Sequence, residues 1–319
     1  MSPESRISPA RLEAARLSAK KKTLWLRARI IGAVRGFFSR RGYLEVETPC
    51  LLRAPIPEPH IAYVDADGGR AVLQPSPEVY MKRLLAAGYE KIFQICRCFR
   101  AEERGDGHLP EFTLLEWYRA GIDYFGLMAE CEEMVRSVAE ELEIGPTLIY
   151  RGREVHLDRV WERITVKEAF DLHSGESLDE VLSSGRFEEC LVRDIEPWLG
   201  TPRPAFLHDY PASMASLSRV RPDDPGVCER VELYLGGLEI ANGFTELNDP
   251  EEQARRLEED LRRRRIKDMM FLPVPETFTT AVGLMPPAAG MALGVDRLVM
   301  IFAGADSIDD VVAFTGEER

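Results

Sequence analysis

The chain of 319 residues is 45% hydrophobic and has a formal net charge of −13 at pH 7, which argues against a surface dedicated to polyanions, because phosphate contacts need clustered lysine and arginine. No apolar run approaches the length of about 18 residues that a membrane-spanning helix needs, and the basic start of the chain lacks the apolar segment of a signal peptide, so we expect a cytoplasmic protein with no membrane partner. The six cysteines form neither a CxxC pair nor a Cys/His metal spacing, which indicates free thiols.

The first predicted element is a long helix. Apolar residues recur at helical spacing between residues 9 and 42, and a glycine then ends the pattern. A short strand over residues 44–47 follows and is ended by a proline. Farther on, Ser76-Pro77 predicts another helix start, because proline fits the first turn of a helix. A chain of this length can bury one large core, and we expect residues 1–319 to form a single domain.

The segment FQICRCFRAEERGDGHLPEFTLLEWYR predicts a strand, a polar loop and a returning strand. Side chains two apart on a strand point to one face, so we expect Arg100 and Glu102 together, and likewise Glu116 and Tyr118. Arg100 offers a planar fork for phosphate or carboxylate oxygens, and Phe112 offers a flat ring on which a purine can stack. One hairpin should therefore carry a cation, two acids and a stacking ring.

Two later stretches read as helices with little chemistry. Residues 124–143 and 165–200 have helical patterns, so we expect a peripheral helical region over about 124–200. The arginine-rich run at 256–268 has glutamates three and four residues away, which indicates a solvated, ion-paired helix face.

The segment CERVELYLGGLEIANGF predicts a second hairpin, since a two-residue Gly-Gly turn is a strong hairpin signal. In such a loop Tyr234 faces Glu239, and Glu232 is the diagonal neighbour of Glu239 on the same face, roughly 7–8 Å away. Two carboxylates at that separation can share Mg²⁺ with nucleotide phosphates. Two solvent-facing acids on an amphipathic hairpin would give the same pattern.

Three segments resemble the motifs of class II aminoacyl-tRNA synthetases, most closely those of the lysyl branch. RGYLEVETPCL looks like motif 1, the hairpin with Arg100 looks like motif 2, and GMALGVDRLVM looks like motif 3. The resemblance covers most of the chain and implies an α+β fold, with a mostly antiparallel β-sheet flanked by helices. It also implies a homodimer, since motif 1 forms the dimer interface in this superfamily.

The resemblance assigns roles to particular residues. It implies that Arg100 holds the ATP α-phosphate and the substrate carboxylate, that Arg297 stacks on adenine, and that both act in catalysis together with Glu239. The resemblance also implies that ATP is bound by Glu102, Phe112, Glu239, Ile240 and Gly294. It implies that Mg²⁺ is bound by Glu232 and Glu239. It implies that the amino-acid substrate is bound by Ser76, Glu78, Glu116, Tyr118, Asn242, Glu246 and Ala292.

Two of these acids carry the expected substrate preference. Glu78 is matched to the amino group near the substrate carboxylate, and Glu246 is matched to a distant ammonium. Acids at both ends of a pocket imply a substrate with two amines, such as lysine or β-lysine, because a neutral side chain would leave Glu246 buried without a partner.

Within the superfamily the chain most resembles the branch of ligases that modify a lysine of elongation factor P. Motif 1 begins at Arg41, so we expect no anticodon-binding domain, and Ala292 stands where lysyl-tRNA synthetases have glycine. PASMASLS also resembles the ligase branch, whereas PPAAG is closer to the synthetases. Leu109 replaces the asparagine expected before Pro110-Glu111, which removes one amide from the expected nucleotide contacts.

The implied reaction is ATP-dependent activation of (R)-β-lysine or lysine as an aminoacyl adenylate, and its transfer to a lysine ε-amine of elongation factor P. We do not expect tRNA to be the acceptor. One alternative is a lysyl-tRNA ligase that lacks its anticodon module. Another is a non-catalytic paralogue that senses lysine or ATP, which the retained Arg100, Glu239, Glu246 and Arg297 oppose.

Overall fold

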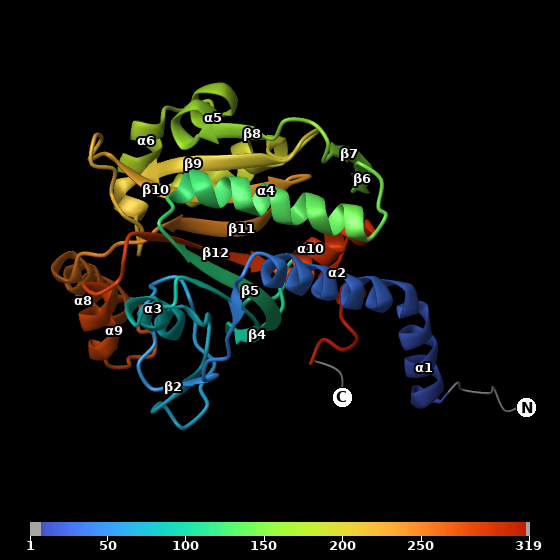
Figure 1. The fold of residues 1–319 in the computed structure, drawn as a ribbon, viewed down its shortest axis with the longest axis horizontal. Helices are drawn as coiled ribbons and strands as arrows, with labels where there is room; N and C mark the ends of the chain where they lie inside the picture. The colour runs from blue at the N-terminus through green and yellow to red at the C-terminus, as the bar shows by residue number, and fades with distance from the viewer. Residues whose placement is uncertain (1–7, 317–319) are drawn as a thin grey trace, which may run out of the picture.

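One eight-stranded sheet organises the computed structural model, which describes residues 8–316 (Figure 1). Its strands, in spatial order, are β1 (Leu44–Glu45), β4 (Lys91–Phe99), β5 (Glu111–Ala120), β12 (Ala288–Gly294), β11 (Leu238–Thr245), β10 (Val227–Leu235), β9 (Ala205–Pro211) and β8 (Glu162–Thr165). The two outermost pairs, β1 with β4 and β8 with β9, are parallel, and all other pairs are antiparallel. The expected α+β fold with a mostly antiparallel sheet is confirmed.

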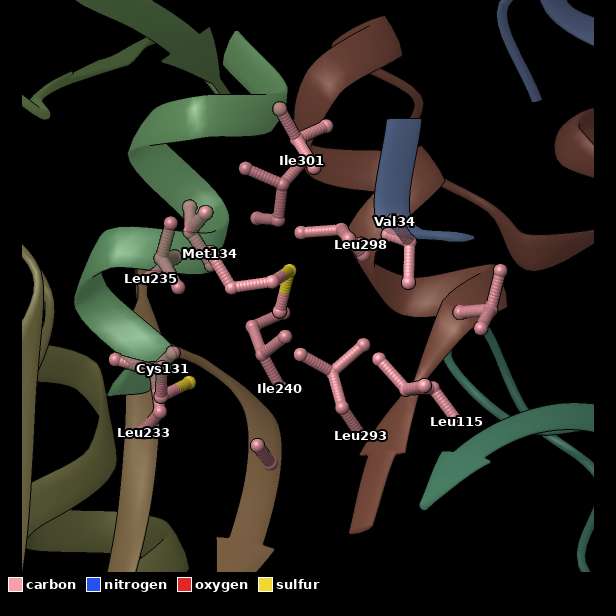
Figure 2. Close-up of a cluster of buried hydrophobic side chains, with 14 of the residues drawn as sticks. Val34, Leu115, Cys131, Met134, Leu233, Leu235, Ile240, Leu293, Leu298 and Ile301 are labelled. Carbon is pink, nitrogen blue, oxygen red and sulfur yellow. The ribbon is translucent and has the colours of Figure 1, made fainter. Parts of the chain in front are cut away.

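Three helices cover one face of this sheet: α2 (Lys21–Arg40), α4 (Tyr124–Glu141) and α10 (Val295–Ala303) (Figure 1). Met134 of α4 and Leu298 of α10 point toward strand side chains such as Leu293 (Figure 2). Residues two apart on each strand share a face, so this apolar layer takes Leu115 and Trp117 of β5 and leaves the residues between them to the other face. Each fully buried side chain of this size contributes about 1.5–3 kcal/mol through burial.

Helices α3 (Glu78–Ala86), α8 (Pro250–Ile266) and α9 (Glu276–Val282) lie near one end of the sheet, away from α2 and α10 (Figure 1). They form a smaller apolar cluster that includes Ile92 and Tyr118 from the strands. Two short pairs complete the strands, β2 (Leu51–Leu52) with β3 (Val72–Leu73), and β6 (Thr147–Tyr150) with β7 (Arg153–His156).

The predicted N-terminal helix is divided in two. Helix α1 (Pro9–Ala19) buries no residue, whereas α2 buries Ile30, Ala33, Val34, Phe37 and Phe38 at helical spacing. Lys20 separates the helices, and its Nζ donates to the backbone oxygens of Asp309 and Val312 at 2.6 and 3.0 Å. The helical pattern ends as expected at Gly42, whose φ of 76° suits glycine.

Residues 124–200 do not form one peripheral helical region. Helix α4 lies in the main core, and β6, β7 and β8 follow it before the outer helices begin. The sequence pattern indicates a helix correctly but not the surface that the helix covers. The outer part consists of α5 (Val166–His173), α6 (Leu178–Ser183), α7 (Phe187–Cys190), a π turn over Leu191–Ile195 and a 3-10 turn over Glu196–Trp198. Two further 3-10 turns span Ala212–Met214 and Ile308–Val311.

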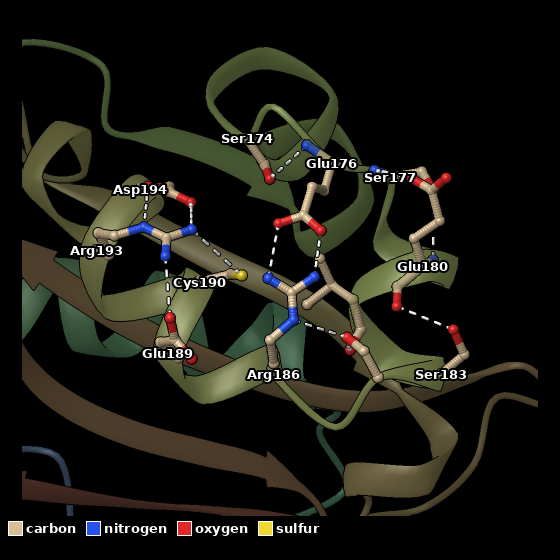
Figure 3. A network of polar contacts seen from close by, with 12 residues as sticks. Ser174, Glu176, Ser177, Glu180, Ser183, Arg186, Glu189, Cys190, Arg193 and Asp194 are labelled. Atoms are coloured by element: carbon tan, nitrogen blue, oxygen red, sulfur yellow. Dashed lines mark hydrogen bonds and ion pairs between the residues drawn. The ribbon is translucent and has the colours of Figure 1, made fainter.

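Polar contacts hold this outer part together (Figure 3). Arg186 forms a two-pronged ion pair with Glu176, and Ser177 caps α6 by accepting a hydrogen bond from the backbone nitrogen of Glu180 at 3.3 Å. All six cysteines are free, as predicted. Among residues 8–316, none of the helices combines the length and the apolar character needed to cross a membrane.

Candidate functional site

The Gly-Gly hairpin positions the first part of the site. Gly236 and Gly237 have φ of 64° and 82°, as a two-residue hairpin turn requires, and Tyr234 faces Glu239 as predicted. Ile240 is an extra residue in β11, so Glu232 faces Asn242. The bulge keeps Glu232 and Glu239 on one face of the sheet and brings Asn242 to the same face.

A row of facing residues continues from this hairpin across the sheet. All but Ala292 are polar, and we call it the polar row. Glu232 on β10 pairs with Asn242 on β11, Asn242 with Ala292 on β12, and Ala292 with Glu116 on β5. The adjacent row on the same face brings Phe244, Gly290 and Tyr118 into line. These residues come from distant parts of the sequence, and the register of four strands places them on the face that α2, α4 and α10 leave uncovered.

Gly290 is required by its neighbours. A Cβ atom at this position would lie 2.3 Å from Cε1 of Tyr118 and 2.7 Å from Oε1 of Glu246. Only glycine leaves room for both side chains, so the GMALG segment shapes the floor of the site.

A cavity of about 220 Å³ lies beside the polar row. It is lined by predicted site residues from motifs 2 and 3 and the Gly-Gly hairpin: Arg100, Phe112, Glu239, Ile240, Asn242, Ala292, Gly294 and Arg297. This mixture of a flat ring, two guanidinium groups and apolar wall suits a nucleotide base joined to phosphate. We refer to it as the nucleotide cavity.

Two arginines supply the positive charge of the nucleotide cavity. Arg100 follows the end of β4, and its Cζ lies 5.1 Å from the centre of the Phe112 ring. Its Nε is buried and has no hydrogen-bond partner within residues 8–316. Arg297, in the first turn of α10, donates to the backbone oxygen of Glu239 at 2.8 Å and forms an ion pair with its carboxylate at 3.1 Å. The guanidinium of Arg100 therefore lies over the Phe112 ring with its Nε donor unused.

Glu102 does not share a strand face with Arg100. Strand β4 ends at Phe99, and Glu102 has a φ of 67°, so the two-residue alternation does not extend to it. Glu102 does not line the nucleotide cavity, whereas Glu103 does. Oε1 of Glu103 lies 3.7 Å from Nη1 of Arg100. His108 also lines the cavity and contacts Arg297, and burial together with the Arg297 charge lowers the pKa of His108.

Leu109 occupies the position where the family pattern predicts asparagine. Its side chain is buried in the main apolar core and also borders the nucleotide cavity. An apolar residue here strengthens packing and gives up one polar contact to the cavity.

A second group of charged residues lies at the other side of the polar row. Glu78, Glu116 and Glu246 gather around the ammonium of Lys82, and we call these four residues the acid cluster. Lys82 Nζ lies 2.5 Å from Glu78 Oε1 and 2.6 Å from Glu246 Oε2. Ser76 and Tyr118 donate to the two carboxylate oxygens of Glu116 at 2.8 and 2.5 Å.

The acid cluster differs from the expected arrangement in one respect. Glu78 and Glu246 were expected at opposite ends of the pocket, but their carboxylates approach the same nitrogen of Lys82. Sequence reasoning overlooked Lys82, although its i,i+4 spacing from Glu78 places the two on one helix face.

Burial sets the electrostatics of the acid cluster. Burial and the neighbouring Glu78 raise the pKa of Glu116 to about 8. Burial also raises the pKa of Glu246 to about 8, against the opposing charge of Lys82. Burial disfavours the Lys82 ammonium, but the carboxylates of Glu246 and Glu78 outweigh it and raise the pKa of Lys82. The cluster therefore gathers three carboxyl groups around one cation, and two of these groups titrate near the physiological range of pH.

The two acids matched to Mg²⁺ differ in their freedom to bind it. Glu239 lines the nucleotide cavity with 34% of its side chain exposed, and carboxylate oxygen is a donor that Mg²⁺ prefers. Both oxygens of Glu232 are already engaged, by the hydroxyls of Tyr210 and Tyr234 and by Arg230. Residues 8–316 contain no preformed group of three metal-binding side chains. The donors fit a Mg²⁺ bound chiefly by nucleotide phosphates and Glu239.

Comparisons with known proteins identify the family of the chain. The family described as tRNA synthetases class II (D, K and N) matches residues 2–318. An elongation factor P–(R)-β-lysine ligase of Pectobacterium carotovorum subsp. carotovorum (strain PC1) is 40% identical, over 94% of this chain and 97% of its own. A protein of the same name from Salmonella paratyphi B (strain ATCC BAA-1250 / SPB7) is 38% identical, over 93% of this chain and 96% of its own.

Proposed function

The chain belongs to the class II tRNA synthetase family, and on this basis we propose that it is an ATP-dependent ligase that activates (R)-β-lysine or lysine and transfers it to a lysine ε-amine of elongation factor P. The observation that carries this proposal is the polar row that joins the nucleotide cavity to the acid cluster. An amino acid lying along this row would have its carboxylate near Arg100 and its amines among the acids.

In the proposed activation step, a carboxylate oxygen of the amino acid attacks the α-phosphorus of ATP and pyrophosphate leaves. Arg100 is suited to bind the α-phosphate and the attacking carboxylate, because its unpartnered Nε and planar fork can bond two oxygens at once. Phe112 and Arg297 both line the nucleotide cavity, and we propose that they hold the adenine between them. Asn242, in the polar row, is suited to orient the substrate carboxylate.

Mg²⁺ would be held by Glu239, with Glu232 beside it, and would neutralise charge on the phosphates. Glu239 also fixes Arg297 through its carboxylate and its backbone oxygen. We therefore propose that Glu239 links metal binding to the position of the residue that stacks on adenine.

In the proposed transfer step, the ε-amine of the acceptor lysine attacks the adenylate carbonyl, a C–N bond forms, and AMP leaves. The net charge of −13 favours a protein acceptor over tRNA. Because the acceptor is a translation factor, we place the enzyme in the cytoplasm. The working unit that we propose is a homodimer formed through the motif 1 region around β1.

Pyrophosphate exchange tests the activation step. We expect exchange with lysine and with at least one isomer of β-lysine, and none with a neutral amino acid of similar length such as norleucine, because norleucine would leave the buried Oε1 of Glu246 without a hydrogen-bond donor. The assay measures label from pyrophosphate that enters ATP when each amino acid is added. Absence of exchange with every diamine would favour a sensor of lysine or ATP that performs no chemistry.

A further inference from the structure

Lys82 is a buried cation inside a pocket that we propose for a cationic substrate. Its side chain is 2% exposed, and lysine is almost never buried without partners. Its Nζ contacts the carboxylates of Glu78 and Glu246 and lies 4.9 Å from the centre of the Phe244 ring. The lysine therefore joins α3, which carries Glu78, to the end of β11, which carries Phe244 and leads to Glu246.

This position has an electrostatic consequence. Two carboxylates that approach the same point in a buried site repel each other, and without a cation one of them takes up a proton. A protonated carboxyl group is a weak partner for a substrate ammonium. The charge of Lys82 opposes this protonation, and its fixed position on α3 sets where the two carboxylates point.

Lys82 does not use all the binding capacity of the acid cluster. Glu246 Oε1 is buried and has no hydrogen-bond partner within residues 8–316, while the other oxygen of the same carboxylate contacts Lys82. Because Gly290 has no side chain, this oxygen can lie against the sheet, where a Cβ atom would be only 2.7 Å from it. Glu116, held by Ser76 and Tyr118, adds a further acid. An incoming ammonium thus finds oriented oxygens that Lys82 leaves open.

We infer that Lys82 is a positioning residue for the amino-acid substrate: it acts as an internal counterion that opposes protonation of Glu246 and orients the carboxylates of Glu78 and Glu246 to receive the substrate ammonium. This inference rests on the proposed function. It makes the specificity for a diamine depend on a residue that does not itself bind the amines.

The inference predicts a change in the pH dependence of amino-acid binding. The groups that face Glu246 are Glu78 and Lys82 from α3 and Glu116 and Tyr118 from β5. The pKa of Glu246 is about 8, so its ionised form, and with it the affinity for an ammonium, is lost as the pH falls through that value. Removing Lys82 raises this pKa further, so the loss of affinity should occur at higher pH.

The experiment compares the wild-type protein with Lys82→Met and Lys82→Arg by pyrophosphate exchange. The exchange rate is measured at pH values from about 6.5 to about 9, in steps of about half a pH unit. At pH 7 we expect Lys82→Met to raise KM for the diamine about 10-fold or more, the effect of roughly one pKa unit, with KM for ATP almost unchanged. The difference from wild type should narrow at the highest pH, where the acids ionise without a counterion. Lys82→Arg keeps the charge and should have a pH profile close to that of wild type.

Arg83→Met is the matched control, because Arg83 is the next residue of α3 and its guanidinium lies over the Tyr80 ring and not in the acid cluster. It should leave both KM values unchanged. An unchanged diamine KM in Lys82→Met, or an equal increase in both KM values at every pH, would overturn the inference in favour of a purely structural role.

Two further measurements keep the test decisive. If Lys82→Met does not fold, the double variant Lys82→Met/Glu78→Gln removes one acid along with the cation and should recover folded protein, measured as a higher Tm; failure of this recovery counts against the counterion role. If the wild-type protein shows no exchange, the proposed function fails, and calorimetric titration of lysine into wild type and Lys82→Met tests the counterion role separately. Equal affinity of the two proteins for lysine would then contradict it.

Discussion

Replacing Arg100 with alanine should lower the rate of amino-acid activation by about 10²-fold or more, the usual scale for removing one preorganised donor that stabilises developing charge. Arg100 borders the nucleotide cavity, and its buried Nε has no protein partner within residues 8–316. The residues that its guanidinium contacts, Phe112 and Glu103, also line the cavity, so the expected loss arises within the site. Pyrophosphate exchange at saturating ATP and amino acid measures the effect.

Arg97→Ala is the matched control for this prediction. Arg97 lies on β4, three residues before Arg100, is 51% exposed and forms a 3.7 Å ion pair with Glu111 outside the cavity. Its removal should change exchange by less than about twofold, since surface ion pairs contribute little. If both variants lose activity equally, the loss reflects damage to β4 and not the loss of a contact to the substrates.

Replacing Glu239 with glutamine should lower kcat/KM for ATP by about 10- to 100-fold without unfolding the protein. Glutamine keeps an oxygen that can accept a hydrogen bond from Arg297, and it removes the negative charge that we assign to Mg²⁺ binding. The defect should therefore shrink as Mg²⁺ is raised. Exchange rates measured over a series of Mg²⁺ concentrations, with Tm as a check of folding, give the answer.

Glu196→Gln separates metal binding from general electrostatics. Glu196 approaches Glu232 and Glu239 from the outer part of the chain, and burial together with the Glu239 charge raises the pKa of Glu196 to about 7. It lies outside the nucleotide cavity, so its replacement should leave the Mg²⁺ dependence as in wild type. Full activity of Glu239→Gln at low Mg²⁺ would show that Glu239 does not serve the metal.

The hairpin at Gly236-Gly237 shows what the sequence could predict about the site. Two glycines with positive φ fix the turn, and the turn places Tyr234 directly opposite Glu239 on the neighbouring strand. The bulge at Ile240 could not be read from the same pattern, because it depends on packing: Ile240 and Ala241 are both buried against the main core.

Local sequence patterns failed where a position depends on distant residues. Glu102 follows the end of β4 in a left-handed conformation, so strand alternation misplaced it. The pattern of residues 124–143 predicts a helix, but not that the sheet buries one face of it. The role of Lys82 needs Glu246, which lies far away in sequence and reaches α3 only through the register of the sheet.

The family resemblance predicted more of the chemistry than residue patterns did. Strand periodicity alone indicates that Glu116 and Tyr118 share a face, and the structure confirms this with a 2.5 Å hydrogen bond. It does not indicate that Ala292 and Asn242 lie in line with Glu116, because that alignment depends on β12 lying between β5 and β11. The fold assembles the site from four strands and two helices whose order in space differs from their order in sequence.

The most direct test of the proposed ligase activity is the intact mass of elongation factor P after incubation with the wild-type protein, ATP, Mg²⁺ and (R)-β-lysine, with bulk tRNA present as a competing acceptor. We expect elongation factor P to gain the mass of one β-lysyl group and the tRNA to stay uncharged. An unchanged mass of elongation factor P together with efficient charging of tRNA would contradict the proposed activity.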